Sequence, residues 1–169
     1  MFGEFHGLPI HALVLHVAVV LTPLAAVVGL VFLVPRWRRL LRWPLVAVAA
    51  LTVIVLFVTK QSGQNLKAAL GDQLNNDVTG SLVQRHQQLG DRLFIVMIVF
   101  FAATVAGALL VPAGGAAVRP MNSAGWLSHA VAAVVAFGAA FVLVLVYQVG
   151  EAGAKATWNP SGTFDYSSK

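Results

Sequence analysis

The residues of this chain whose types and spacing could do chemistry are histidines at the edges of apolar segments. His11 and His16 lie in the stretch GLPIHALVLHVAVVL, five residues apart, at the start of an apolar run. Five residues turn an α-helix by about 500°, or about 140° net, so the two imidazoles point to different faces and cannot share one metal. His86 precedes another apolar run, in LVQRHQQLGDRL, with Gly90 one helical turn further on.

Two imidazoles from different helices beside a slot lined by small residues are typical of a b-type haem. We therefore expect His16, the deeper of the first pair, and His86 to be the ligands, with Gly90 leaving room for a flat group. His11 lies at a helix start, where the helix dipole favours the neutral imidazole that metal ligation or proton exchange needs. The same histidines could instead bind copper or zinc. Cations that could pair with haem propionates are Lys60, Lys67, Arg85 and Arg92.

The remaining polar groups have simpler interpretations. His6 and His129 are expected to be hydrogen-bonded at the two membrane interfaces. Glu151, just after the last apolar run, is either a solvated carboxylate at a helix end or a partner for the nearby cations.

Three functions are compatible with these residues. The first is a small membrane electron-transfer protein that binds haem b near the outer face and exchanges electrons with a quinone or a membrane redox subunit. The second is a metal-ion or proton-conducting membrane protein that uses the same histidines. The third is a non-catalytic accessory or assembly subunit, or a homo-oligomer, associating through Ala132, Ala136 and Ala140 of the last apolar run. No motif for hydrolysis or phosphoryl transfer occurs, so a carrier or subunit is expected rather than a stand-alone enzyme.

The elements that must carry these residues are membrane helices. Of the 169 residues, 59% are hydrophobic and 10% are charged, against about a quarter charged in a soluble domain. Four runs are apolar and long enough to cross a bilayer, which needs roughly 20 residues. We predict an all-α, integral membrane four-helix up-down bundle built from one domain, residues 1–169, without an evident internal repeat. The expected spans are about 10–34, 41–59, 92–111 and 126–149, with an outer loop over 60–91 that carries a separate surface helix. The third helix is expected to begin near Thr79, well outside the membrane.

The arginine-rich connection PRWRRLLRW sets the expected topology. Short arginine-rich loops stay in the cytoplasm, so both termini are expected outside, in a multi-pass protein of the plasma membrane. The first run is too long for a cleavable signal. The net charge of +5 comes mostly from this cluster and does not indicate nucleic-acid binding. The absence of cysteine excludes disulfides, thiolate-bound clusters and c-type haem.

A family resemblance that extends over nearly the whole chain is carried by four segments distributed along it: LPIHALVLHVAVVLTPLAAV, TKQSGQNLKAAL, LVQRHQQLGDRL and GEAGAKATW. Within them, the H-x4-H pattern of His11 and His16 and the H-x3-G pattern of His86 and Gly90 resemble the bacterial four-helix membrane family catalogued as domain of unknown function 2231. Relatives occur fused to Rieske-type or cytochrome-like domains, so the resemblance implies membrane redox chemistry. Members often carry a histidine where this chain has Glu151, so not every family histidine is available here as a ligand.

Overall fold

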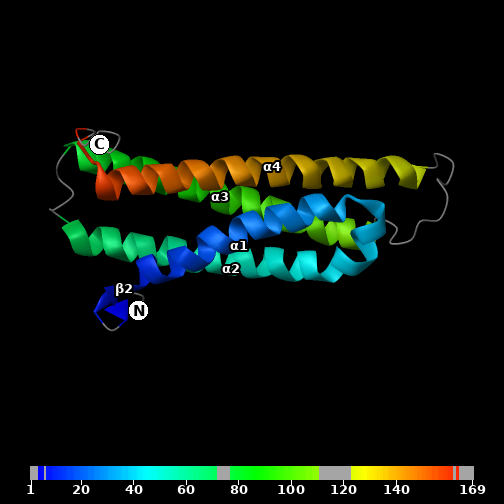
Figure 1. Ribbon diagram of the computed structural model, residues 1–169, viewed down its shortest axis with the longest axis horizontal. Helices are drawn as coiled ribbons and strands as arrows, with labels where there is room; N and C mark the ends of the chain where they lie inside the picture. Colours follow the sequence, from blue (N-terminus) through cyan, green and yellow to red (C-terminus); the bar gives the residue numbers. More distant parts are fainter. Residues whose placement is uncertain (1–3, 6, 72–76, 111–122, 162, 164–169) are drawn as a thin grey trace, which may run out of the picture.

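Four long helices make up the protein (Figure 1); a computed structural model describes residues 4–5, 7–71, 77–110, 123–161 and 163. The helices are α1 (Ile10–Phe32), α2 (Arg38–Leu70), α3 (Asp77–Leu110) and α4 (Ser123–Trp158), with a short 3₁₀ helix η1 (Pro35–Trp37) before α2. Strands β1 (Glu4–Phe5) and β2 (Leu8–Pro9) form a small antiparallel hairpin in front of α1. The predicted all-α four-helix architecture is confirmed.

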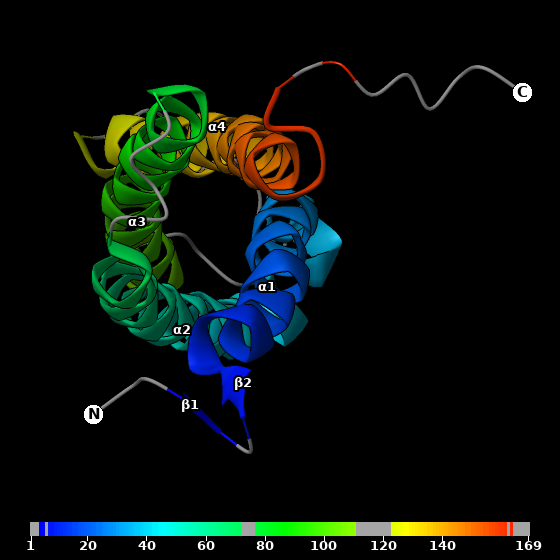
Figure 2. The ribbon, with the colours of Figure 1, turned by 90° about the vertical axis from the view of Figure 1, so that its left-hand side faces the viewer.

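The helices run alternately up and down and form a ring in chain order. Each of the four packs against its two neighbours in the ring, so α1 faces α3 and α2 faces α4 across the axis (Figure 2). The start of α1 and the end of α4 lie at the same end of the bundle (Figure 1), together with the last turns of α2 and the first turns of α3. We call this the histidine end, after His11 and His86, and the opposite end, at η1, the arginine end.

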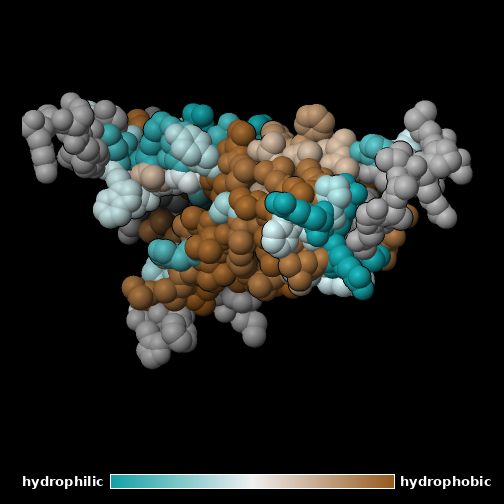
Figure 3. Space-filling view, turned by 45° about the vertical axis from the view of Figure 1, so that its right-hand side comes forward, coloured by the Kyte–Doolittle hydropathy of each residue, from teal (hydrophilic) through white to brown (hydrophobic). Residues whose placement is uncertain are grey.

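The outer surface of the bundle is built for a bilayer. All four helices are long and apolar enough to cross a membrane, and large apolar side chains such as Phe137 (75% exposed), Val20 (63%) and Ile95 (61%) point outward. Apolar surface covers the middle of the helices, and hydrophilic residues gather toward the two ends (Figure 3). A soluble monomer rarely exposes a continuous apolar surface of this size. The chain is therefore a multi-pass membrane protein.

The expectation of an outer loop over 60–91 is wrong at its start, where helix α2 continues without a break to Leu70. The expected start of the third helix near Thr79 is confirmed, since α3 begins at Asp77. The predicted separate surface helix is the end of α2, because Ser62, Leu66 and Leu70 recur at helical spacing and keep one side of this segment against the rest of the bundle. Gly71, with a φ of +37°, ends the helix in a conformation that glycine adopts readily. The membrane helices thus extend beyond their apolar parts at the histidine end.

An internal repeat that is not evident in the sequence is present in the structure. Buried positions of α1 and α3 correspond at one constant shift along the chain: Ala18, Thr22, Ala25, Gly29 and Phe32 match Leu93, Met97, Phe100, Thr104 and Gly107. Buried positions of α2 and α4 correspond in the same way: Leu45, Ala49, Thr52 and Ser62 match Val135, Ala139, Val142 and Ala152. Residue types differ at nearly every pair, and at the five α1/α3 pairs a small residue in one helix matches a larger one in the other. The bundle is therefore two helical hairpins related by an approximate two-fold axis.

Phe100 shows how this size exchange fills the core. Its side chain is 1% exposed and lies between two glycines, Gly29 on α1 and Gly138 on α4. A Cβ at position 29 would come within 2.7 Å of the Phe100 ring, and one at position 138 within 3.1 Å. The expected small-residue face of α4 is thus used in part inside the bundle, where Ala139 is also fully buried.

Replacing Gly29 with alanine should destabilise the bundle relative to Gly150→Ala. Both substitutions gain the same helix propensity, but only the alanine at 29 overlaps Phe100, since nothing lies within 4 Å of a Cβ at 150. Overpacking of this kind costs about 1–3 kcal/mol. Thermal unfolding of the detergent-solubilised protein measures the difference, and equal melting temperatures for the two variants would contradict the packing described here.

Candidate functional site

His11 is directed from α1 toward α2. Its Nδ1–H donates to the backbone carbonyl oxygen of Thr59 at 3.0 Å, and the Ser62 hydroxyl oxygen lies 3.4 Å from the same nitrogen. The ring edge lies against Gly63, where a Cβ would be 3.0 Å from Cε1 and 3.1 Å from Nδ1. A carbonyl can only accept, so this hydrogen bond fixes the proton on Nδ1 and leaves Nε2 as the available lone pair.

His86 makes the equivalent contact from α3 toward α4. Its Nδ1–H donates to the carbonyl oxygen of Val149 at 2.9 Å, and its ring edge lies against Gly153. A Cβ at position 153 would be 3.0 Å from both Cε1 and Nδ1 of the ring. The same tautomer follows, with Nε2 again unprotonated.

The two contacts are one arrangement used twice. In each, a histidine donates a hydrogen bond to the carbonyl four residues before a glycine of the next helix. Because that glycine has no side chain, the ring can occupy the space beside it. His11 corresponds to His86 by the same shift along the chain that relates the buried positions of α1 and α3. Gly63 corresponds to Gly153 by the shift that relates those of α2 and α4. We call each arrangement a histidine–glycine contact. The approximate two-fold axis therefore passes between the two imidazoles.

A cavity of about 640 Å³ opens between these contacts at the histidine end. All four helices line it, and His11 and His86 both belong to its wall. No described residue hydrogen-bonds Nε2 of either ring. Cofactor-sized ligands occupy cavities of about 300–1,000 Å³ with mostly apolar walls and few polar groups. The cavity has the size and composition of such a site.

The expected orientation of His16 is wrong. Its side chain is exposed and lies outside the cavity wall, and its Nδ1–H donates to the Ala12 carbonyl of its own helix at 2.6 Å. The prediction that His11 and His16 point to different faces is confirmed, but His11 is the one directed inward. It lies seven residues before buried Ala18, on the inward stripe of α1, whereas His16 falls between stripe positions. The depth of a histidine along the helix did not predict its role, because the helix face on which a side chain lies decides what it contacts.

Other residues expected near the site divide between two surfaces. Gly90 lines the cavity, and nothing lies within 4 Å of a Cβ built there. Lys60 and Lys67 also line it, paired with Asp91 and Gln87 respectively, each at 2.9 Å. Arg85 and Arg92, which were expected to join these lysines, instead border a separate pocket on another face of α3.

The residues with simpler expected roles lie apart from the cavity. His129 is exposed near the start of α4, toward the arginine end. Glu151 is exposed and forms an ion pair with Lys155 at 2.7 Å. His6 lies outside the described residues. Within the described part of the chain, no group of three or more histidine, cysteine, aspartate or glutamate side chains is arranged to hold a metal ion.

Sequence reasoning missed four residues that shape the site: Thr59, Gly63, Val149 and Gly153. Two of them contribute only a carbonyl oxygen, which any residue type supplies. A signal for the glycines does exist in the sequence, since Gly63 lies seven residues after buried Leu56 and Gly153 seven after Val146. A seven-residue register carried through all four helices would have placed both glycines and both inward histidines on the axis.

The fold and the site define a class: a multi-pass four-helix membrane protein with two equivalent histidines on one cavity. Comparison of the chain with protein-family models, with curated proteins and with solved structures finds no match. Its function is therefore argued from the site.

Alanine at position 63 or 153 should break the histidine–glycine contact that it enters. The added Cβ forces the ring away from its carbonyl acceptor, at a cost of about 1 kcal/mol relative to Gly90→Ala, which borders the same cavity without a clash. Nitrogen-15 NMR of histidine-labelled protein in detergent micelles reports the tautomer directly. Gly63→Ala should release His11 alone from the Nδ1–H form and Gly153→Ala should release His86 alone. An unchanged tautomer in both variants would rule the arrangement out.

Proposed function

We propose that this protein binds haem b between His11 and His86 and transfers electrons in the membrane. The observation that carries the proposal is the pair of inward imidazoles on opposite helices, each with Nδ1–H bound to a carbonyl and Nε2 without a protein partner. Haem-ligating and metal-ligating histidines use this arrangement, because the outer hydrogen bond fixes the ring and makes the ligating nitrogen more basic.

The walls of the cavity fit a flat, largely apolar group. Leu15, Ala18, Leu93 and Val146 line its deeper part. Positions 90 and 150 are glycines with open space where a Cβ would lie, so planar rings have room beside the histidines. A site lined by small residues between two ligating helices is how bundles hold haem.

Cations at the cavity mouth fit the acidic edge of the same group. Among the described residues, Lys67 hydrogen-bonds only a neutral amide, that of Gln87, so its charge is available to a carboxylate. Lys60 is already paired with Asp91 and contributes less. The haem iron supplies one-electron chemistry when bound; the protein's residues hold it, exclude water and set its surroundings.

The membrane orientation that we propose places the histidine end outside the cell membrane. Four arginines and no acidic residue lie between α1 and the first turns of α2, at the arginine end, and such connections remain cytoplasmic. The partner would then be a quinone or redox subunit in the membrane, with an acceptor outside. The family resemblance points to the same chemistry.

The absorption spectrum of the protein tests this proposal. After expression with haem supplementation and purification in detergent, we expect a Soret band and, on reduction, the sharp visible bands of a low-spin haem. His11→Ala and His86→Ala should each abolish the low-spin spectrum, because each removes one axial ligand. His16→Ala is the matched control and should leave the spectrum intact, since His16 is exposed outside the cavity.

Two other results would replace the proposal. A colourless protein that carries stoichiometric copper or zinc, lost in the His11 and His86 variants, would assign the same nitrogens to a metal-ion function. A colourless, metal-free protein whose histidine variants still assemble with their native complex would show an accessory subunit instead.

A further inference from the structure

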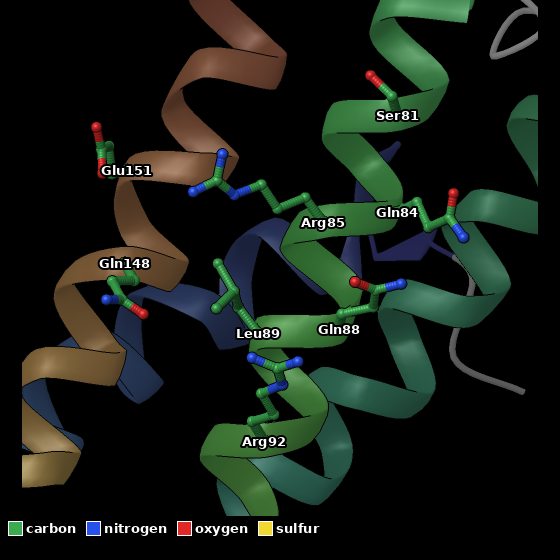
Figure 4. A pocket seen from close by; sticks show the side chains of 8 residues that line it. All are labelled: Ser81, Gln84, Arg85, Gln88, Leu89, Arg92, Gln148 and Glu151. Atoms are coloured by element: carbon green, nitrogen blue, oxygen red, sulfur yellow. The ribbon is translucent and has the colours of Figure 1, made fainter.

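A second pocket, of about 580 Å³, lies on the outside of the bundle between α3 and α4 at the histidine end. Figure 4 shows its lining. The residues that matter to its chemistry are Gln84, Arg85, Gln88 and Arg92 from α3 and Gln148 and Glu151 from α4. It lies on a different face of α3 from His86, so it is separate from the cavity described above.

The two arginines of this pocket have no ion-pair partner among the described residues. Arg85 extends across the groove toward α4, and Arg92 reaches back along α3 toward it (Figure 4). The one carboxylate in the lining, Glu151, is held by Lys155 at 2.7 Å. With Lys155 beside Glu151, the arginines leave the pocket with a net positive charge.

The arginine side chains suit one kind of anion. They are seven residues apart, about 10 Å along one face of the helix, and they border the pocket from two sides, Arg85 extending toward α4 and Arg92 toward Leu89 (Figure 4). Guanidinium groups bind phosphate oxygens with two parallel hydrogen bonds. The amides of Gln84, Gln88 and Gln148 add neutral donors around them. Together they form a site for a phosphate group.

The surface next to the pocket is apolar. Arg92 directly precedes the apolar part of α3, and Ile95 (61% exposed) and Val99 (56%) follow on the same face. On α4, Val144 (50%) and Phe141 (53%) continue from Gln148 in the same direction. A molecule with its phosphate at the arginines would therefore lay apolar chains along this strip between the two helices.

We propose that this pocket binds the headgroup phosphate of an anionic phospholipid, with its acyl chains along the α3–α4 strip. The net positive lining favours a headgroup with net negative charge over a zwitterionic one. The proposal does not depend on what the histidine cavity binds.

Native mass spectrometry of the delipidated full-length protein, titrated with phosphatidylglycerol, phosphatidylcholine or inorganic phosphate, tests this site. We expect phosphatidylglycerol to bind most tightly and the double variant Arg85→Gln/Arg92→Gln to weaken its first binding step by about tenfold or more, because charge-assisted hydrogen bonds are lost. Arg36→Gln/Arg39→Gln removes the same charge at the arginine end and should retain that step. All four arginine side chains are exposed. An unchanged helical circular dichroism spectrum checks that each double variant is folded.

Three outcomes would overturn the proposal. Equal affinity for the two lipids would show that headgroup charge is not recognised. Displacement of the lipid by micromolar inorganic phosphate would identify free phosphate as the occupant. An equal loss in both double variants would show only a general attraction of anionic lipid to positive charge.

Discussion

An imidazole N–H that is turned into a helix bundle needs an acceptor within the protein, because a buried polar group without a hydrogen bond is costly. Helical carbonyls already accept a backbone hydrogen bond, and a bulky ring on a neighbouring helix reaches one most readily where the backbone beside it carries no side chain. Gly63 and Gly153 provide that access to Thr59 and Val149. The position of each ring, its tautomer and the direction of its free nitrogen all depend on this approach of a ring to a glycine.

The buried hydroxyl groups obey the same constraint by a local route. Thr22, Thr52 and Thr104 are fully buried, and each donates at 2.7 Å to a carbonyl of its own helix. The short hydrogen bond of each lies within its own helix, and Thr52 makes a longer second contact of 3.4 Å to the Leu21 carbonyl of α1, so each hydroxyl proton has its acceptor inside the protein. His11 and His86 differ because their second nitrogen has no such partner within the described chain. This contrast separates a polar group that stabilises the core from one that is available for binding.

Composition and charge were sufficient to predict the four helices, their order and their membrane character, because bilayer thickness and the cost of burying charge act on each segment alone. The site needed more. The angular separation of His11 and His16 follows from one helix and was predicted correctly. Which of them faces inward depends on how α1 packs against its neighbours, a property of the whole bundle. The helical extension of α3 was predicted, but residues 60–70 were read as a loop with a separate helix because polar residues dominate them, yet α2 continues through them beside α3. The repeat was hidden because it is preserved in burial and backbone contact, while the residue types differ at nearly every pair.

The two-fold arrangement is broken at the points where a bound molecule would be oriented. Ser62 lies 3.4 Å from Nδ1 of His11, but its counterpart beside His86 is Ala152, so the two imidazoles differ in their surroundings. Lys60 and Lys67 on α2 correspond to Gly150 and Thr157 on α4. Within these two pairs, the positive charge at the cavity mouth therefore lies on the α2 side. A symmetric pair of donors can hold the centre of a flat ligand equally from both faces. The unequal charge at the cavity mouth then sets the orientation of the ligand. A ligand with acidic groups on one edge is favoured with that edge beside α2.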